Sequence, residues 1–322
     1  MNQLPEQDLP PGRHRLLKEH LMTEIRHPDE AVAKPRKRWV RPALTAAAVA
    51  TVAAVTFTVL PSSGGADAGP RITSAAALLE DVALAAEHQH GYGRIRDDQF
   101  VYVDIEKTFF ETGPDGKAVS VPLYRKESWV SVDGTRKTLV RDGRDGSELS
   151  NPPAPRGQEI YADFISYDFL RSLPADPDAM YDYLVETPPR LLQFAWIDIP
   201  VLGFGDEYDT HQTVLQLTGR LLNGSIVPPA QSAALYRAVA RIPGVTVIKD
   251  SVDARGRHGV GITRTDTKLP VRLEWTFDKK TYELLGQRST LTRDYRGLKK
   301  GTVISDTAVQ RRAVVDKAGE RP

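Results

Sequence analysis

The chain has 322 residues, no cysteine, and 43 basic against 42 acidic residues, for a formal net charge of +1. The lack of cysteine excludes disulfide bonds, thiolate nucleophiles, cysteine-ligated zinc and a lipidated N-terminal cysteine. The near-zero net charge excludes a generally basic nucleic-acid-binding protein, so we expect no nucleic-acid partner.

Residues 1–41 form a basic N-terminal segment, with nine basic and six acidic side chains. Leucine and isoleucine recur at helical spacing over residues 13–26, which predicts a short amphipathic helix that ends before Pro28. A single helix of this size is marginal in isolation. Two roles stay open for this predicted cytoplasmic tail: it orients the chain in the membrane, or its helix docks on a cytoplasmic regulatory partner.

Residues 42–60 are predicted to form a transmembrane helix. Positions 43–60 contain no charge, glycine or proline, and as a helix they span roughly 27 Å, close to the hydrocarbon thickness of a bilayer. Basic side chains gather on the N-terminal flank only, where they orient the helix: Lys34, Arg36, Lys37, Arg38 and Arg41. The positive-inside rule then predicts a single-pass protein of the cell membrane, with its N-terminus in the cytoplasm and its C-terminal domain extracytoplasmic.

Two other interpretations of this segment stay open. An alanine-rich helix can be buried in a soluble protein, although no neighbouring sequence is typical of a domain that would bury it. The segment can also belong to a signal peptide, because Ala66, Asp67 and Ala68 fit the small-residue pattern that precedes cleavage. Residues 61–70 are rich in glycine, serine and alanine and predict a flexible linker.

Residues 71–322 are predicted to form one extracytoplasmic domain that begins with a helix. Ser74 can cap that helix, which runs through residues 75–89. Alternating and β-branched residues then predict an antiparallel meander, whose strands are separated by Asp-Gly turns. The strands expected here are Gln99–Thr112, Pro122–Val132 and Arg136–Arg141. Residues 143–163 are rich in proline and glycine and predict a loop.

The middle of the domain is predicted to be helical and its last third to be β-sheet. Helices are expected at Tyr167–Ser172, after the Asp176 cap, over Glu207–Leu222 and after Pro228. The later strands are Val245–Val252, His258–Thr265, Val271–Phe277, Tyr282–Thr292 and Thr302–Val315. The expected fold is therefore α+β: a curved, half-barrel-like antiparallel sheet of seven to nine strands, with helices packed on one face.

Few residues suggest chemistry. His88 and His90 could meet at a metal only in an extended segment, and the stretch from Asp142 to Glu148 lacks the ligand spacing of a calcium loop. No nucleophile elbow, P-loop, dinucleotide fingerprint or zinc-protease motif is present. We therefore expect a protein without a cofactor or bound metal that is not an enzyme; a hydrolase whose chemistry follows no known motif is the alternative.

Large aromatic side chains are spread along the predicted sheet. They pack in the core, or some of them line an apolar cavity for an acyl chain or a peptide. The candidates for such a lining are Tyr102, Phe109, Tyr124, Trp129, Trp196, Trp275 and Phe277.

Six segments together resemble an actinobacterial family of single-pass membrane proteins, and the resemblance covers essentially the whole chain. They are Ala75–Ala86, Asp98–Val103, Glu127–Arg136, Ser172–Leu184, Ala234–Ile262 and Glu274–Ser289. Genes of this family often lie beside those of extracytoplasmic-function sigma factors, which implies a link to envelope-stress regulation. More distantly, the domain is similar to lipoprotein-carrier and RseB/MucB-like folds, which implies a curved sheet with a helical lid around an apolar cavity.

These observations predict a membrane-anchored extracytoplasmic binding or sensor protein with a lipid or protein ligand outside the cell. A structural envelope protein without a signalling role is a further alternative to the hydrolase.

Overall fold

The computed structural model describes residues 74–89, 92–187 and 209–322. Its centre is one nine-stranded sheet with the order β4-β3-β2-β1-β9-β8-β7-β6-β5, in which neighbouring strands are antiparallel. The sheet is open, with β4 and β5 at its edges. The predicted α+β class, with an antiparallel sheet, is confirmed. The predicted tail, transmembrane helix, linker and orienting basic residues lie outside the described residues.

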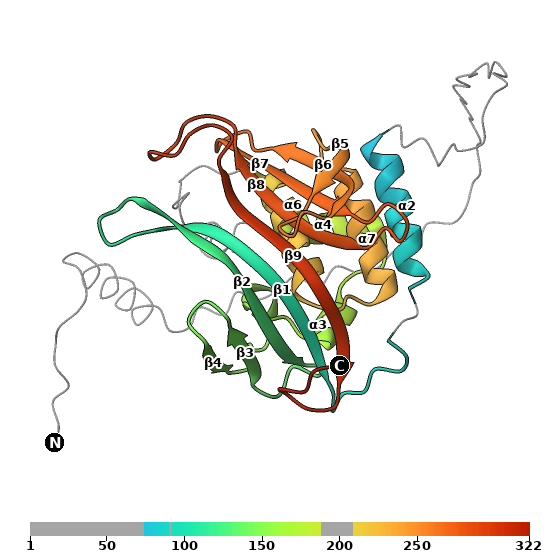
Figure 1. Ribbon diagram of the computed structural model, residues 1–322. Helices are drawn as coiled ribbons and strands as arrows, with labels where there is room; N and C mark the ends of the chain where they lie inside the picture. The colour runs from blue at the N-terminus through green and yellow to red at the C-terminus, as the bar shows by residue number, and fades with distance from the viewer. Residues whose placement is uncertain (1–73, 90–91, 188–208) are drawn as a thin grey trace, which may run out of the picture. The chain divides into compact units, whose positions relative to one another are not determined.

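Two meanders build the sheet, and the last strand joins them. The first comprises β1 (Phe100–Thr112), β2 (Ala118–Ser131), β3 (Thr138–Asp142) and β4 (Ser147–Asn151). The second comprises β5 (Thr246–Val252), β6 (His258–Thr265), β7 (Val271–Phe277), β8 (Leu284–Leu291) and β9 (Val303–Val315). Figure 1 shows β9 as a long curved strand between β1 and β8, where Phe100 pairs with Val315.

Strand β4 corrects the prediction of a loop over residues 143–163. The chain turns at Asp145 and Gly146, where Gly146 has a φ of +75°. Glycine adopts this left-handed conformation at little cost, so the turn can return the chain along β3. The side chains of β4 are mostly polar and exposed, as expected of an edge strand.

The helices lie between the two meanders in sequence, apart from α2 (Ala75–Glu87), which precedes β1. They are α3 (Tyr167–Ser172), α4 (Pro177–Glu186), α6 (Thr210–Gly224) and α7 (Pro229–Ala240). The caps anticipated from the sequence are formed: Ser74 Oγ accepts a hydrogen bond from the Ala77 amide, and Asp176 accepts from Asp178 and Ala179. Among the described helices, none is both long and apolar enough to cross a membrane.

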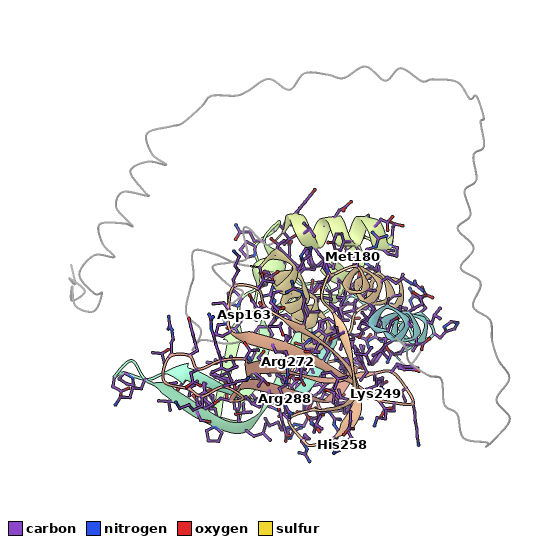
Figure 2. The ribbon with its side chains drawn as sticks, turned by 90° about the horizontal axis from the view of Figure 1, so that it is seen from above. Asp163, Met180, Lys249, His258, Arg272 and Arg288 are labelled. Atoms are coloured by element: carbon purple, nitrogen blue, oxygen red, sulfur yellow. The ribbon has the colours of Figure 1, made fainter. Side chains whose placement is uncertain are left out.

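The main core lies between these helices and the second meander. Leu78 of α2, Leu215 of α6 and Leu235 of α7 are buried against Trp275 and Phe277 of β7. Figure 2 shows the helices, with Met180 among them, on one side of the sheet, and His258 on the side away from them. Burying this apolar layer supplies the main driving force for folding.

Candidate ligand-binding site

A pocket of about 260 Å³ opens where three distant parts of the chain meet. Val82, Ala86 and Gln89 contribute from the C-terminal half of α2 and the residues after it. The turn that leads into β8 contributes Tyr282 and Glu283. The volume is at the lower end of the range for small-molecule sites, so the pocket suits a small ligand.

Local sequence explains why the chain between α6 and α7 lines this pocket. Helix α6 ends at Gly224, and Ser225 is in an extended conformation, so the chain leaves the helix there. Pro229 occupies the first turn of α7, a position where the missing amide hydrogen costs nothing. The short connection presents Ile226 and Val227 to the pocket, beside Leu222 from the last turn of α6.

The pocket wall is mixed in character. Aliphatic side chains from α2 and the α6–α7 connection face it together with the aromatic rings of Tyr92 and Tyr236. Serine and threonine hydroxyls, Glu283 and the guanidinium group of Arg312 supply polar groups. Such a wall suits a ligand that has both an apolar body and a polar group.

Arg312 of β9 is the charged group inside the pocket. Its Nη2 donates a hydrogen bond of 2.8 Å to the carbonyl oxygen of Leu222, whereas its buried Nε has no hydrogen-bond partner. Burial lowers the pKa of Arg312, and the acidic groups of Tyr92, Tyr236 and Glu283 oppose that shift. An arginine nevertheless stays protonated in proteins, so the pocket holds a positive charge.

Glu283 places a negative charge at the rim. Its side chain is exposed, and its Oε1 accepts a hydrogen bond of 3.1 Å from Nε2 of Gln89. This contact joins the end of α2 to the β7–β8 turn beside the pocket.

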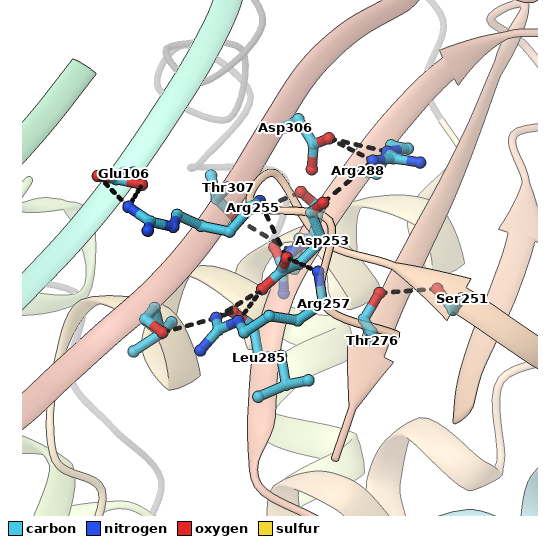
Figure 3. Close-up of polar contacts among 12 residues, drawn as sticks. Glu106, Ser251, Asp253, Arg255, Arg257, Thr276, Leu285, Arg288, Asp306 and Thr307 are labelled. Carbon is cyan, nitrogen blue, oxygen red and sulfur yellow. Dashed lines mark hydrogen bonds and ion pairs between the residues drawn. The ribbon is translucent and has the colours of Figure 1, made fainter. Parts of the chain in front are cut away.

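A second polar site, which we call the second-face cluster, lies on the sheet face away from the helices. Its residues are Glu106, Asp253, Arg255, Arg257, Arg288 and Asp306 (Figure 3). Successive strand residues point to opposite faces, and Trp275 faces the helices. Its neighbour Glu274 therefore points away, and the register places Arg288 opposite Glu274 and Asp306 opposite Arg288.

The second-face cluster fastens the β5–β6 turn across three strands. Asp253 accepts hydrogen bonds of 2.9 Å from the Arg255 and Arg257 amides and of 2.6 Å from Nε of Arg257. Nη2 of Arg257 donates to the carbonyl oxygen of Val309 at 2.8 Å, and Arg255 binds Glu106 at 2.9 Å. These contacts satisfy buried polar groups within the protein, so the cluster has the character of a structural fastening rather than of a ligand site.

Asp306 has a perturbed titration within this cluster. Burial raises its pKa to about 6, against the opposing hydrogen bond from Nε of Arg288 at 2.8 Å, and the charge of Asp253 adds to the rise. Its buried Oδ1 has no hydrogen-bond partner among the described groups. The folded protein therefore holds the proton of this side chain to a higher pH than the unfolded chain does.

We expect Asp306→Asn to remove a stability loss that the protein otherwise shows between pH 4 and pH 6. A carboxyl whose folded pKa is raised from 3.8 to about 6 binds more protons in the folded state, so stability falls as the pH rises through this range. The loss over this range amounts to about 2 kcal/mol. Urea unfolding at pH 4.5, 6 and 7.5 measures it. The exposed Glu148 is the control, because Glu148→Gln should leave the slope unchanged; an unchanged slope in Asp306→Asn would contradict the assignment.

The aromatic residues considered for the core or for a cavity lining are distributed over separate clusters. Tyr102 and Trp129 stack with ring centroids 5.1 Å apart, in a cluster with Phe100 and Val315. Trp275 and Phe277 lie in the main core with ring centroids 6.3 Å apart. The rings of Phe109 and Tyr124 also have centroids 6.3 Å apart. None of these six side chains lines the pocket described above. Trp196 lies outside the described residues.

The polar motifs of the sequence analysis have local roles where the structure describes them. Nδ1 of His88 is 2.7 Å from the carbonyl oxygen of Leu84, and Asp142 accepts a hydrogen bond from the Arg144 amide within the turn. His90 lies outside the described residues. Within the described ranges, no three histidine or acidic side chains are grouped as metal ligands would be.

Comparison with known proteins gives distant structural similarity. No protein-family model and no curated protein matches the chain. Among solved structures, the chain is similar to the one described as "Crystal structure of MucB", with 14% sequence identity and a TM-score of 0.23. The match covers 77% of this chain and 60% of that chain, so this chain spans about three fifths of the length of MucB. MucB is thus a distant structural neighbour of this α+β domain.

Proposed function

We propose that this protein is a membrane-anchored extracytoplasmic binding or sensor protein, and that it binds its ligand without chemical conversion. The helix over residues 42–60 anchors it, the N-terminus is cytoplasmic, and the α+β domain lies outside the membrane. The ligand enters the pocket between α2, the α6–α7 connection and the β7–β8 turn.

The observation that carries this proposal is the mixed wall of the pocket. Apolar side chains from α2 and the α6–α7 connection stand beside a single guanidinium group. The pocket's serines are not arranged for nucleophilic catalysis: the Ser225 hydroxyl donates to the carbonyl oxygen of Ile226, and the described residues that line the pocket include no histidine. A nucleophilic hydroxyl needs an adjacent base, so binding is supported better than hydrolysis.

The position of the pocket also allows a bound ligand to affect the arrangement of α2. Its wall combines α2, which follows the predicted linker, with strands of the opposite end of the sequence. A ligand that prefers one arrangement of α2 against the β7–β8 turn would shift the populations of the two arrangements. The link to sigma-factor regulation belongs to this proposal and rests on the sequence resemblance alone.

Native mass spectrometry of the full chain, released from detergent or nanodiscs, tests binding. We expect the protein to carry an additional small organic mass that is lost on partial unfolding. A purified protein that carries no such mass, and takes up none from a panel of small amphiphiles, would contradict the binding role.

Reporter fusions test the topology. A periplasmic-type reporter such as alkaline phosphatase should be active when it is fused after Pro322 and inactive when it is fused before Met1. Activity at the N-terminal position alone would contradict the orientation, because the basic flank at residues 34–41 is predicted to stay in the cytoplasm.

A further inference from the structure

Three of the other partly or fully buried arginines of the described residues pair with a carboxylate. Arg264 pairs with Asp209, Arg257 with Asp253 and Arg288 with Asp306. Arg312 forms no ion pair with a described carboxylate, and its buried Nε lacks an acceptor. The exposed Glu283 is the acidic side chain of the pocket that acts on Arg312, and it forms no direct ion pair with it. A buried charge without a direct ion-pair partner is costly, so such a site is suited to receive an anion.

We propose that the pocket binds an organic monoanion, whose carboxylate or phosphate group pairs with Arg312 and whose short apolar body lies against Val82, Ala86 and Leu222. This inference rests on the proposed binding function and specifies its ligand class. The planar guanidinium offers two adjacent donors to one anionic group, which is the geometry that carboxylates and phosphates accept.

Two tyrosines add neutral donors around Arg312. Tyr92 and Tyr236 line the same pocket. Burial raises the pKa of both hydroxyls, so they stay protonated and can donate to an anion. An anionic head beside Arg312 would thus have two neutral donors near it as well as the guanidinium.

The rim and the wall limit the rest of the ligand. Glu283 repels a second negative charge at the mouth, which favours one anionic group over two. The volume of about 260 Å³ limits the apolar body, and the aliphatic part of a mostly polar lining gives it a small surface to cover. A free inorganic anion would satisfy Arg312 and leave that apolar surface wet.

The test compares octanoate with octanamide, which has the same apolar body and a neutral head. Isothermal titration uses the full chain in phosphatidylcholine nanodiscs at pH 7.5. We expect octanoate to bind at least about tenfold more tightly than octanamide, because a hydrogen bond to a charged group contributes more than one to a neutral group. Acetate at equal concentration should not displace octanoate, since it lacks the apolar body.

Arg312→Gln should lower the affinity for octanoate to that for octanamide and leave octanamide binding unchanged. Retained octanamide binding also shows that the variant is folded. Arg311→Gln is the matched control: it removes the same charge from the neighbouring position of β9, where the side chain is exposed and donates to the carbonyl oxygen of Pro322. We expect it to bind octanoate as the unmodified protein does. Tyr236→Phe, which removes only a hydroxyl, should weaken octanoate binding severalfold.

The outcomes separate this inference from the proposed function. Equal affinities for octanoate and octanamide, or an unchanged octanoate affinity in both Arg312→Gln and Tyr236→Phe, would overturn the anion assignment and leave the binding function standing. Displacement by acetate would overturn the role of the apolar body. Failure of every amphiphile to bind the unmodified protein would overturn both. Nanodiscs with added phosphatidylglycerol distinguish the two sources of the anionic group. If phosphatidylglycerol weakens octanoate binding, the ligand is a lipid headgroup. If octanoate binding is undiminished, the ligand is a free organic acid.

Discussion

Asp209→Ala should lower the free energy of unfolding by about 3–5 kcal/mol, because it removes one partner of a buried ion pair. The side chains of Asp209 and Arg264 are 4% and 5% exposed, and Nη2 of Arg264 is 2.9 Å from Oδ2 of Asp209. Asp209 also caps α6 through the Gln212 amide and accepts two hydrogen bonds from Thr267. Without this carboxylate, the guanidinium of Arg264 is left buried and unpaired.

The pH dependence of this effect has a definite sign. Burial by itself would raise the pKa of Asp209, but hydrogen bonds from Thr267, Gln212 and Arg264 outweigh it and lower the pKa to about 2. A carboxyl with a depressed folded pKa stabilises the protein above its unfolded pKa of 3.8 and loses that contribution as the pH falls toward 2. The stability difference between the unmodified protein and Asp209→Ala should therefore shrink by about 2 kcal/mol between pH 5 and pH 2.

Asp176 provides the matched control for Asp209. It is also an aspartate N-cap, of α4, but its side chain is exposed and binds only the amides of Asp178 and Ala179. Asp176→Ala should cost about 1 kcal/mol, the value of a cap alone. Chemical denaturation of both variants decides the matter: equal losses would mean that the pairing with Arg264 contributes nothing. Adding Arg264→Met to Asp209→Ala should recover part of the loss, because it removes the unpaired charge.

Local signals were sufficient to predict most of the sheet. The strands from β5 to β9 lie within a few residues of the segments expected from alternation and from turn signals. Proline and aspartate likewise marked the start of α4. Strand β4 was missed because its sequence is short and polar. Its backbone is held in the sheet by pairing with β3, which its own residues do not indicate. Pairing is a property of two segments, so one segment read alone does not reveal it.

The pocket could not be predicted, because its wall joins α2, the α6–α7 connection, the β7–β8 turn and β9, which are far apart in sequence. Arg312 gave only a weak signal, as one of two adjacent arginines in a strand that also carries other polar side chains. The sequence left the aromatic residues open between core packing and a cavity lining for a related reason. Alternation assigns residues of one strand to two faces but does not say which face the helices cover. Tyr102 and Phe109, an odd number of positions apart in β1, accordingly belong to different aromatic pairs.

Trp275→Ala should cost about 3–5 kcal/mol and decides whether this residue is a core side chain or lines a cavity. Trp275 is fully buried in the main core and contacts Phe277 edge to face. Truncation leaves a large void that packed neighbours fill only in part, so the lost transfer free energy and the cost of the cavity add together. A residue that faces a ligand cavity would leave little new void, and its truncation would cost less than about 1 kcal/mol, within the range of an ordinary surface change.

Two further variants make the result for Trp275 specific. Nε1 of Trp275 is buried and has no hydrogen-bond partner among the described residues, so Trp275→Phe gives up no hydrogen bond and removes an unpaired donor. It should therefore lose less than half as much stability as Trp275→Ala. Leu149→Ala, at a side chain that is 51% exposed on β4, should leave the unfolding midpoint nearly unchanged. Unfolding of Trp275→Ala at the same denaturant concentration as Leu149→Ala would contradict the assignment of Trp275 to the core. It would support the alternative that the aromatic residues line an apolar cavity.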